Sequence, residues 1–489
     1  MCATANRVSL QRFRGFESLS FRQLSLKFFV EFLPQIKRFT FYRRTKRQIQ
    51  PFAMNSYYLW TIGCQMNTAD SERLGAALEQ MGIQQVEKAA DADVIVLNSC
   101  VVRQGAEDKV ASNLAWMAPL KKKQPERIVA LMGCMVGPNS DDLARRFPYV
   151  DVFMRPQQFE PLLEMVGERT GVDWEGCVGP LTPNRPDVTC HVPIIHGCDM
   201  MCTFCIIPYR RGRQVSRPVE DVALEVETLA SRGVKEVTLL GQTVDAYGHD
   251  LLDQPNLADL FARLNEIDGI ERIRFLTSHP KFMTQEIIQA VADLPKVCEH
   301  INLPVQAGDD EILNEMRRQY SRADYIDLVG RIRQAMPDVA LNTDIIVGFP
   351  GETEEQFQQT LDLLAELRLD KVHCASYSTR PGTIASRTMD DAVPEDEKTS
   401  RRQRVDSLQE QIQTEINAKL VGSYVEILVE GRKRGKWQGR TRSHKLVFFE
   451  DEAYHQGEMV TVKIERSSPW SLQGTLAVEA KLLTHRGDA

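Results

Sequence analysis

The chain has 489 residues, of which 43% are hydrophobic and 26% are charged, and its formal net charge is −7. These values are ordinary for a folded protein of about three domains, and no apolar run approaches the roughly 20 residues of a membrane-spanning helix. They exclude a membrane protein and a uniformly basic nucleic-acid-binding surface, although local basic patches must be judged separately. Eleven cysteines without a secretory signal indicate a reducing compartment. We therefore expect a cytoplasmic protein whose thiols are core residues or metal ligands.

Residues 1–53 differ in composition from the rest of the chain. They carry eleven Lys/Arg against two acids, Glu17 and Glu31. A basic, acid-poor leader is typical of an organelle transit peptide or an RNA-binding arm. An over-extended reading frame, with Met54 as the true start, explains the same composition. We expect this leader to be disordered or a mis-assigned start, and we assign it no catalytic residue.

Residues 54–170 repeat one pattern three times, in which a short apolar strand ends in a cysteine and a helix follows. "YYLWTIGC" ends in Cys64, "ADVIVLNSC" in Cys100 and "RIVALMGC" in Cys134. Strands that alternate with helices predict a doubly wound parallel sheet of the α/β class. The carboxyl ends of parallel strands meet at one edge, so we expect the three cysteines to lie there. On these residues alone, buried core thiols are an equally open interpretation.

A Pro/Gly-rich passage at residues 171–188 marks a linker, and a second series of strands and helices follows over residues 184–415. Its strands are expected in "HVPIIHGC", "VKEVTLLGQ", "IERIRFLTSHP", "VCEHINLPVQ", "ALNTDIIVGFPGE" and "KVHCASYSTRPG". Six parallel strands with crossover helices predict a partial α/β barrel. Gln242, Ser278, Gln306 and Asp344 stand where strands end, which is the catalytic face of barrel folds.

The hydrophobic period changes near the carboxyl terminus. Residues 394–420 read as one charged helix, after which apolar residues alternate with a period of two in "SYVEILVEG", "WQGRTRSHKLVFFE", "EMVTVKIER" and "LQGTLAVEA". This alternation predicts a small closed antiparallel β-barrel over residues 416–482.

The stretch "HGCDMMCTFCIIPYRRGRQ" places Cys198, Cys202 and Cys205 in a C-x3-C-x2-C pattern. A structural zinc site usually takes four ligands, often in two C-x2-C pairs, and no second C-x2-C pair is present. Soft thiolates suit iron–sulfur clusters, and a compact loop lets three of them reach three corners of one cubane. The fourth iron would then be open to a substrate.

This loop, at the end of the first expected barrel strand, resembles the radical S-adenosylmethionine enzymes. The resemblance implies that the open iron binds S-adenosylmethionine and that its reductive cleavage gives a 5′-deoxyadenosyl radical. "TIGCQMN", "NSCVVRQGAEDKV" and "MGCM" resemble the amino-terminal domain of methylthiotransferases, where three cysteines hold an auxiliary four-iron cluster. The family therefore implies two [4Fe–4S] clusters, each with three Cys ligands, and two molecules of S-adenosylmethionine per turnover.

Within that family, "GCQMN", "LLGQTVDAYG" and "TDIIVGFPGETEEQF" are similar to the branch that acts on isopentenyladenosine in tRNA, the MiaB type. The resemblance covers about residues 54–482. It implies transfer of a methylthio group to C2 of N6-isopentenyladenosine at position 37 of tRNA, with an electron donor such as a flavodoxin or ferredoxin and a sulfur source. Two alternatives stay open: a methylthiotransferase for threonylcarbamoyladenosine tRNA or ribosomal protein S12, and a non-catalytic iron–sulfur RNA-binding protein.

The resemblance also implies further site residues. Gly241 and Gln242 stand where the superfamily places a motif near the methionine part of its cosubstrate, and we predict that Ser278, Gln306 and Asp344 join them. The last domain resembles TRAM, an RNA-binding barrel. Cations contact phosphate and an aromatic ring stacks on a base. We accordingly predict these RNA-binding residues: Arg432, Lys433, Arg434, Lys436, Trp437 and Arg440. A solvated hairpin with one exposed tryptophan is the alternative.

Three arginines follow the cysteine loop directly: Arg210, Arg211 and Arg213. Their guanidinium groups are expected to face the RNA or a carboxylate near the site. Ion pairing with acids on a neighbouring helix is the alternative.

Overall fold

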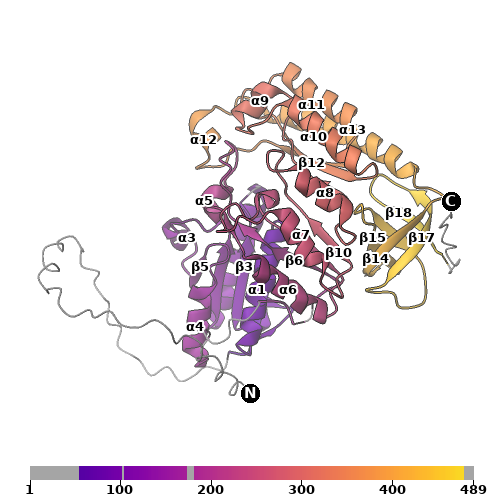
Figure 1. The fold of residues 1–489 in the computed structure, drawn as a ribbon. Coiled ribbons are helices and arrows are strands. Elements are labelled where there is room, and N and C mark those ends of the chain that lie inside the picture. The colour runs from indigo at the N-terminus through magenta and orange to yellow at the C-terminus, as the bar shows by residue number, and fades with distance from the viewer. Residues whose placement is uncertain (1–53, 102–103, 173, 175–180, 185, 478–489) are drawn as a thin grey trace, which may run out of the picture. The chain divides into compact units, whose positions relative to one another are not determined.

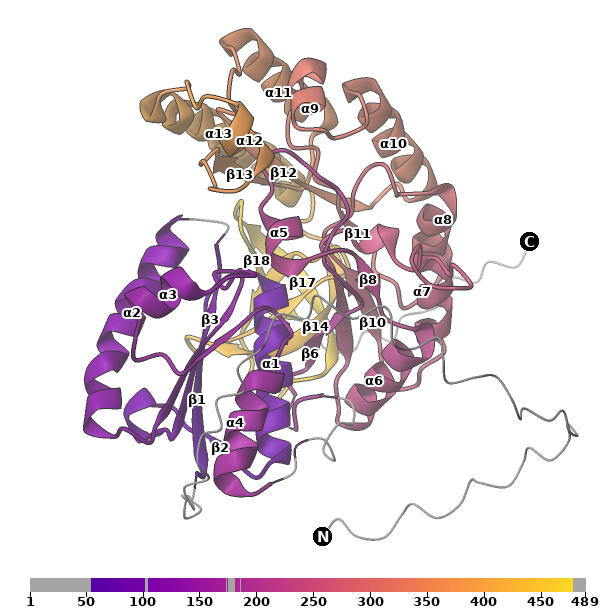
Figure 2. The same cartoon turned by 90° about the vertical axis from the view of Figure 1, so that its left-hand side faces the viewer.

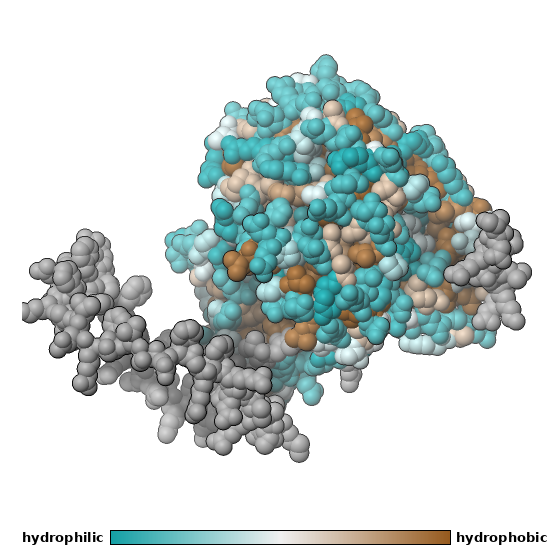
Figure 3. Space-filling model, viewed as in Figure 1, coloured by the Kyte–Doolittle hydropathy of each residue, from teal (hydrophilic) through white to brown (hydrophobic). Residues whose placement is uncertain are grey.

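The computed structural model describes residues 54–101, 104–172, 174, 181–184 and 186–477 (Figure 1). The expectations for residues 1–53, for part of the 171–188 linker and for residues 478–482 lie outside this part of the chain. Within it, no helix has both the length and the apolar character needed to cross a lipid bilayer. On the face drawn in Figure 3, hydrophilic residues cover most of the surface and hydrophobic residues form small separate groups.

The amino-terminal unit is built on a five-stranded parallel sheet with the order β2-β1-β3-β4-β5. Its strands are β1 (Ser56–Thr61), β2 (Gln84–Gln85), β3 (Val94–Ser99), β4 (Ile128–Gly133) and β5 (Val152–Met154). Its helices are α1 (Gln65–Gln80), η1 (Ala89–Asp91), α2 (Gln104–Lys123), α3 (Asp141–Arg146) and α4 (Glu160–Thr170). Every residue of β3 and β4 is buried, as continuous apolar runs in a covered parallel sheet require.

Helices cover both faces of this sheet, which confirms the predicted doubly wound architecture. One apolar core joins α1 and α4 to one face, and a second joins α2 to the other. Figure 2 shows α1 and α4 on one side of the strands and α2 and α3 on the opposite side. The strand order is that of flavodoxin-like folds, which bind ligands where the order reverses, between the first strand and its central neighbour. Cys64 follows β1 and Cys100 follows β3, so two of the cysteines lie at this switch point.

The next unit contains the six predicted parallel strands, arranged as two three-stranded sheets with the orders β10-β9-β6 and β11-β12-β13. They are β6 (Thr189–Pro193), β9 (Glu236–Leu240), β10 (Arg272–Phe275), β11 (His300–Asn302), β12 (Ala340–Val347) and β13 (Lys371–Ser376). A parallel bridge between Ile273 and Val297 links the two sheets. One apolar core runs through both sheets and their helices, so the partial barrel is confirmed.

Helices follow most of these strands. They are α5 (Ile207–Arg211), α6 (Val219–Ser231), η3 (Val244–Ala246), α7 (Leu257–Asn265), α8 (Gln285–Asp293), α9 (Asp310–Glu315), α10 (Arg322–Ala335), α11 (Glu354–Leu367), α12 (Ile384–Thr388) and α13 (Glu395–Ala418). Local sequence sets where several of them begin. At α10, for example, the Ser321 hydroxyl accepts from the Asp324 N–H at 3.2 Å, and the Asp324 carboxylate accepts from the Ser321 N–H at 2.8 Å.

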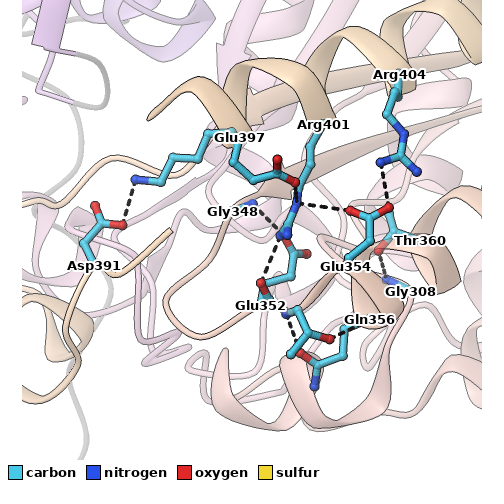
Figure 4. Close-up of polar contacts among 12 residues, drawn as sticks. Gly308, Gly348, Glu352, Glu354, Gln356, Thr360, Asp391, Glu397, Arg401 and Arg404 are labelled. Atoms are coloured by element: carbon cyan, nitrogen blue, oxygen red, sulfur yellow. Dashed lines mark hydrogen bonds and ion pairs between the residues drawn. The ribbon is translucent and has the colours of Figure 1, made fainter. Parts of the chain in front are cut away.

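Helix α13 is anchored to the barrel through the loop that follows β12 (Figure 4). Arg401 donates to the Glu352 carboxylate at 2.9 Å and to the Glu352 carbonyl at 3.0 Å. The same carboxylate accepts the Gly348 N–H at 2.6 Å. Gly348 has φ +69° and its Cα faces the Lys398 side chain, so a larger residue would not fit there. The buried ion pair between Arg401 and Glu352 therefore fixes the path of the chain between β12 and α13.

The carboxyl-terminal unit is the predicted closed β-barrel, with the order β14-β15-β16-β18-β17. Its strands are β14 (Tyr424–Lys433), β15 (Lys436–Arg440), β16 (Leu446–Phe449), β17 (Met459–Ser467) and β18 (Leu472–Leu476). Two details differ from the prediction. The segment expected as one strand over residues 437–450 forms both β15 and β16. The chain turns between them, because the Thr441 N–H donates to the Lys445 carbonyl and the Lys445 N–H donates to the Thr441 hydroxyl. The pair β16–β18 is parallel.

The turn between β15 and β16 contacts the amino end of the α/β barrel. Arg272, the first residue of β10, donates to the Arg440 carbonyl at 2.6 Å. Arg274 on the same strand donates to the carbonyls of Thr441 at 2.7 Å and Arg442 at 2.5 Å. Arg442 in turn forms two hydrogen bonds of 2.8 Å with the Glu299 carboxylate, just before β11. The small β-barrel therefore lies at the amino ends of the strands, whereas the predicted site residues follow their carboxyl ends.

Candidate metal and cosubstrate site

A small hairpin that the sequence did not predict holds the three-cysteine loop. β7 (Ile195–His196) and β8 (Val215–Ser216) pair antiparallel and close the loop at its base. Gly197 has φ +64° and its Cα lies against the Arg213 carbonyl, and the Cys198 N–H donates to the Gly212 carbonyl at 3.2 Å. Two-residue strands carry too little periodicity to be found from sequence.

The thiols of this loop are held by specific polar contacts. The Cys198 Sγ lies 3.3 Å from the Thr243 hydroxyl and accepts the Met200 N–H at 3.4 Å. Arg318 donates from Nη1 to the Cys202 Sγ at 3.4 Å. Burial, followed by the charges of Cys202 and Cys198, raises the pKa of Cys205 to about 12. Burial also raises the pKa of Cys198. A bound cationic metal centre would favour the thiolate form instead.

A cavity of about 170 Å³ opens beside these thiols. The three cysteines line it together with four of the five predicted cofactor-binding residues, namely Gln242, Ser278, Gln306 and Asp344. The fifth, Gly241, is not among the lining residues, and its Cα packs instead against the Ile195 side chain. The structure thus brings together residues that are up to about 150 positions apart in the chain.

Two features of the cavity favour a ligand site. Within the described part of the chain, the Ser278 Oγ and the His279 Nε2 are buried without a hydrogen-bond partner. Thr277 and Gln306 have φ values of +69° and +79°, a region that costs roughly 1 to 3 kcal/mol for a residue other than glycine and that clusters at ligand sites. The donor set and these polar atoms fit a sulfur-ligated cluster with a polar cosubstrate beside it.

Sequence reasoning assigned no role to the lining residues Thr243 and Arg318, and it favoured a structural role for His279. Arg318 is buried, donates to the Pro304 carbonyl at 2.8 Å and to the Tyr320 hydroxyl at 2.9 Å, and so holds a fixed position beside Cys202. No local pattern distinguishes it from other arginines, because its role arises from contacts across more than a hundred residues. His279 had a weak signal, since "SHP" follows a strand.

The first triad in the chain, formed by Cys64, Cys100 and Cys134, lies at the edge of the amino-terminal sheet, and the three-cysteine loop carries the second triad. Cys100 and Cys134 are buried and Cys64 is exposed. Gly63, with φ +139°, allows a close approach, because a Cβ there would lie 3.1 Å from the Cys100 Cβ. Burial raises the pKa of Cys134 to about 11, Arg211 opposes that rise, and the charges of Cys64 and Cys100 add to it. The three sulfurs are therefore electrostatic neighbours, as predicted from the strand ends.

Both triads consist of thiols, the soft donors that suit iron–sulfur clusters. Throughout the described residues, no three His, Cys, Asp or Glu side chains converge closely enough to hold one metal ion. Thiols that bind three corners of a [4Fe–4S] cube lie around it and do not meet at one point.

The two triads border one shared apolar cluster. Cys134 from the first triad and Cys198 and Cys202 from the second belong to it, together with Val101 and Met200. Two chemically similar sites, from separate folding units, thus face a common water-poor region.

The basic hairpin of the small barrel only partly matches the prediction. Arg432, Lys433 and Arg434 are exposed at the β14–β15 turn. Lys436 pairs with Glu450 at 2.9 Å, and Arg440 pairs with Glu430 at 3.1 Å.

Trp437 requires a correction. It is 3% exposed, belongs to the core of the barrel and donates to the Asp451 carbonyl at 3.2 Å, so its ring has no free face for stacking on a base. An alternating strand places every second residue inside a closed barrel, and Trp437 occupies such an inward position.

The arginines after the cysteine loop lie in different environments. Arg211 pairs with Asp70 of α1 at 3.0 Å, which is the ion-pairing alternative, and both side chains are almost fully buried. Arg213 is exposed and pairs with Asp199 at 2.9 Å. Arg210 lies against Gly137, in the loop after Cys134.

Family models match the three parts of the chain. The radical SAM superfamily matches residues 192–364, the uncharacterized protein family UPF0004 matches residues 56–155, and the TRAM domain matches residues 418–477. Radical SAM membership implies S-adenosylmethionine and a [4Fe–4S] cluster as cofactors. The fold also resembles the radical S-adenosylmethionine methyltransferase TsrM from Kitasatospora setae, with a TM-score of 0.51, 13% identity, and coverage of 68% of this chain and 77% of that chain.

Curated relatives match nearly the whole described part. The tRNA-2-methylthio-N(6)-dimethylallyladenosine synthase of Dehalococcoides mccartyi (strain CBDB1) is 48% identical over 86% of this chain and 99% of the relative. The enzymes of that name from Roseiflexus sp. (strain RS-1) and Chloroflexus aurantiacus (strain ATCC 29366 / DSM 635 / J-10-fl) are each 49% identical over 86% of this chain, and over 89% and 91% of the relatives, respectively. The chain therefore belongs to the tRNA-2-methylthio-N(6)-dimethylallyladenosine synthase family of radical SAM enzymes.

Proposed function

We propose that the protein transfers a methylthio group to C2 of N6-isopentenyladenosine at position 37 of tRNA, giving 2-methylthio-N6-isopentenyladenosine. The observation that carries this proposal is the pair of cysteine triads at the edge of one apolar cluster. Two sulfur-ligated sites in one water-poor region suit a reaction that joins a sulfur fragment to an unactivated carbon. The relatives named for that product support the choice of substrate.

The residues divide into two metal sites and one cosubstrate site. Each triad would hold one [4Fe–4S] cluster, with Cys64, Cys100 and Cys134 as one ligand set and Cys198, Cys202 and Cys205 as the other. When bound, the clusters would supply one-electron reduction of one molecule of S-adenosylmethionine and a sulfur that a second molecule methylates, which makes two molecules per turnover. Around the second triad, Arg318 and Thr243 fix two of the sulfurs in place.

The cosubstrate would lie in the cavity beside the second triad. Gln242, Ser278, Gln306 and Asp344 would bind its polar groups, since these side chains line the cavity with the thiols. Gly241 would act indirectly, because its small size lets β9 pack against β7 below the cavity.

We assign tRNA binding to the small barrel, and the exposed Arg432, Lys433 and Arg434 at its β14–β15 turn support this assignment. Lys436 and Arg440 would contribute after exchanging their carboxylate partners for phosphate. The domains would be residues 54–170, 184–415 and 416–482. An electron donor such as a flavodoxin or ferredoxin and a source of sulfur complete the set of partners.

Mass spectrometry of tRNA nucleosides tests the substrate. In a strain that lacks the gene, 2-methylthio-N6-isopentenyladenosine should disappear and the unthiolated nucleoside should accumulate. The wild-type gene should restore the product, and a gene carrying Cys202→Ala should not. If the isopentenyl nucleoside stays fully methylthiolated in the deletion strain, the proposal is wrong. Loss of the methylthio group from threonylcarbamoyladenosine instead would identify the other tRNA branch.

Iron analysis tests the metal sites. Anaerobically prepared wild-type protein should contain about eight irons, from two [4Fe–4S] clusters. The triple variant Cys64→Ala, Cys100→Ala, Cys134→Ala should retain about four irons and still form 5′-deoxyadenosine with dithionite and S-adenosylmethionine, because the second triad is intact. A full iron content in this variant would exclude the first triad as a ligand set. Wild-type protein that forms no 5′-deoxyadenosine would indicate a non-catalytic RNA-binding protein.

A further inference from the structure

One arginine connects the two cysteine triads. Arg211 ends α5, six residues after Cys205, yet its guanidinium lies in the amino-terminal unit. Its Nη2 donates to the Asn67 Oδ1 at 3.0 Å and to the Asp70 Oδ2 at 3.0 Å. The Arg211 side chain is 2% exposed and that of Asp70 is 0% exposed.

The partners of Arg211 belong to the frame of the first triad. The Asn67 Oδ1 that accepts from Arg211 also accepts from the Cys64 Sγ at 3.5 Å. From its Nδ2, Asn67 donates to the Ile62 carbonyl at 3.2 Å and to the Ser99 carbonyl at 2.8 Å. These carbonyls lie just before the two cysteines that follow β1 and β3. Asn67 therefore links Arg211 by hydrogen bonds to the carboxyl ends of β1 and β3.

The neighbouring residue strengthens this junction. The Arg210 side chain lies against Gly137, where a Cβ would collide with its Nη1. Arg155 of the amino-terminal unit donates to the Arg210 carbonyl at 3.2 Å. The helix that leaves the three-cysteine loop is thus fixed to the sheet edge that presents Cys64, Cys100 and Cys134.

Arg211 has more hydrogen-bonding capacity than its described partners use. Its Nε and Nη1 are buried and donate to no nitrogen or oxygen atom of the described residues. The guanidinium lies close enough to the Cys134 sulfur for the two groups to interact. A buried arginine that served only Asp70 would usually have its remaining donors satisfied by carbonyls.

We infer that Arg211 is a positioning residue for the first metal site, with its buried positive charge stabilising the anionic cluster that Cys64, Cys100 and Cys134 hold. This inference rests on the proposed two-cluster function. Hydrogen bonds and net charge near the sulfurs set the reduction potential of an iron–sulfur cluster. Because Arg211 belongs to the loop that holds the second triad, it also couples the electrostatics of the first site to the docking of that loop.

The alternative is an ion pair that only joins two domains, and the sign of two potential shifts separates these roles. The background is full-length protein with Cys198, Cys202 and Cys205 changed to Ala, so that all iron reports on the first triad. In this background, Arg211→Gln removes a positive charge and should lower the reduction potential. Asp70→Asn removes a negative charge next to the same guanidinium and should raise it. Arg213→Gln, at an exposed ion pair, is the control and should leave it unchanged.

A structural role predicts a different pattern, because both substitutions break the same ion pair. Shifts of the same sign, or no shift in either variant, would overturn the inference. Arg211→Lys retains the charge and should return the potential most of the way to that of the background. If Arg211→Gln protein does not fold, as judged by circular dichroism, the Asp70→Asn and Arg211→Lys potentials still decide the question, since no rise in Asp70→Asn contradicts it. A background protein without about four irons would instead refute the two-cluster proposal itself.

Discussion

Asp245 shows how a single buried carboxyl shapes the wall of the cavity beside Cys198, Cys202 and Cys205. It is 2% exposed, and both of its oxygens accept the His279 N–H, at 2.9 and 2.8 Å. This contact fixes the backbone at Ser278 and His279, directly after the positive-φ residue Thr277. The sequence predicted Ser278 as a site residue, because it follows a strand. It did not reveal Asp245, whose partner is 34 residues away.

The stability of the protein should depend on pH through Asp245. Burial raises its pKa to about 8, against about 3.9 in an unfolded chain. Between about pH 4 and pH 8 the folded carboxyl keeps its proton while the unfolded one releases it, so the free energy of unfolding falls as pH rises. Thermal melting of Asp245→Asn should show a flatter pH dependence across this range than wild type. Parallel curves would contradict the prediction, and Asp268→Asn at an exposed position is the control.

Tyr454, rather than Trp437, should stack on RNA. Tyr454 is 72% exposed and lies edge-on to Trp437 with 5.6 Å between ring centroids, and the Arg432 guanidinium lies 5.5 Å from the Trp437 ring. Tyr454→Ala should weaken tRNA binding by about 1 to 3 kcal/mol, the value of one base–aromatic stack. Filter binding at fixed salt measures this change. The 64% exposed Tyr424 supplies the control, and equal affinities of Tyr454→Ala, Tyr424→Ala and wild type would refute the assignment.

At the scale of elements, hydrophobic period alone predicted most strands and long helices. The completely buried β3 and β4 and the charged helix α13 are the clearest cases. The failures have a common cause. The two-residue strands β7 and β8 pair where Gly197 turns the chain against Arg213, and the break between β15 and β16 lies at a turn closed by hydrogen bonds between Thr441 and Lys445. Turns and two-residue strands have no hydrophobic period, so the period of the sequence does not predict them.

The anchor of α13 should be a major source of stability. Arg401 and Glu352 are both almost fully buried, and the Glu352 carboxylate also holds the Gly348 N–H (Figure 4). Arg401→Ala leaves that carboxylate buried without a cation, which typically costs about 3 to 5 kcal/mol. Urea unfolding should show this loss, whereas Arg402→Ala, exposed on the same helix, should change stability by less than about 0.5 kcal/mol. Similar midpoints for the two variants would show that Arg401 contributes no more than a surface residue.

At the scale of the whole described chain, sequence predicted the three units but not their contacts. The two junctions depend on arginines whose partners come from other units. Arg211 reaches Asp70, and Arg274 reaches the carbonyls of Thr441 and Arg442. No pattern in the sequence distinguishes an arginine that joins two units from any other arginine in a strand or short helix. Motifs in the sequence grouped the cysteines of the loop with residues that line the same cavity, whereas the contact between Arg211 and Asp70 became visible only in three dimensions.

Arg274→Ala should loosen the small barrel from the α/β barrel. It removes two hydrogen bonds to the β15–β16 turn and leaves the buried Glu236 without its 2.9 Å partner. Hydrogen exchange should therefore become faster at residues 440–445 and at the start of β10 than in wild type, while β3 and β4 stay protected. Arg466→Ala, exposed on β17, is the matched control. Unchanged exchange at the turn would mean that Arg274 does not hold the junction.

The placement of the small barrel bears on how a large substrate would be bound. The small barrel contacts the α/β barrel near the amino ends of strands whose carboxyl ends border the cavity beside Cys198, Cys202 and Cys205, and the eight residues of β12 alone span about 26 Å. If the β14–β15 turn contacts tRNA as proposed, the polynucleotide must be long enough to reach that turn while its target base lies near the cavity. Shortening the tRNA on the side that reaches the turn should then weaken binding without changing which base is modified.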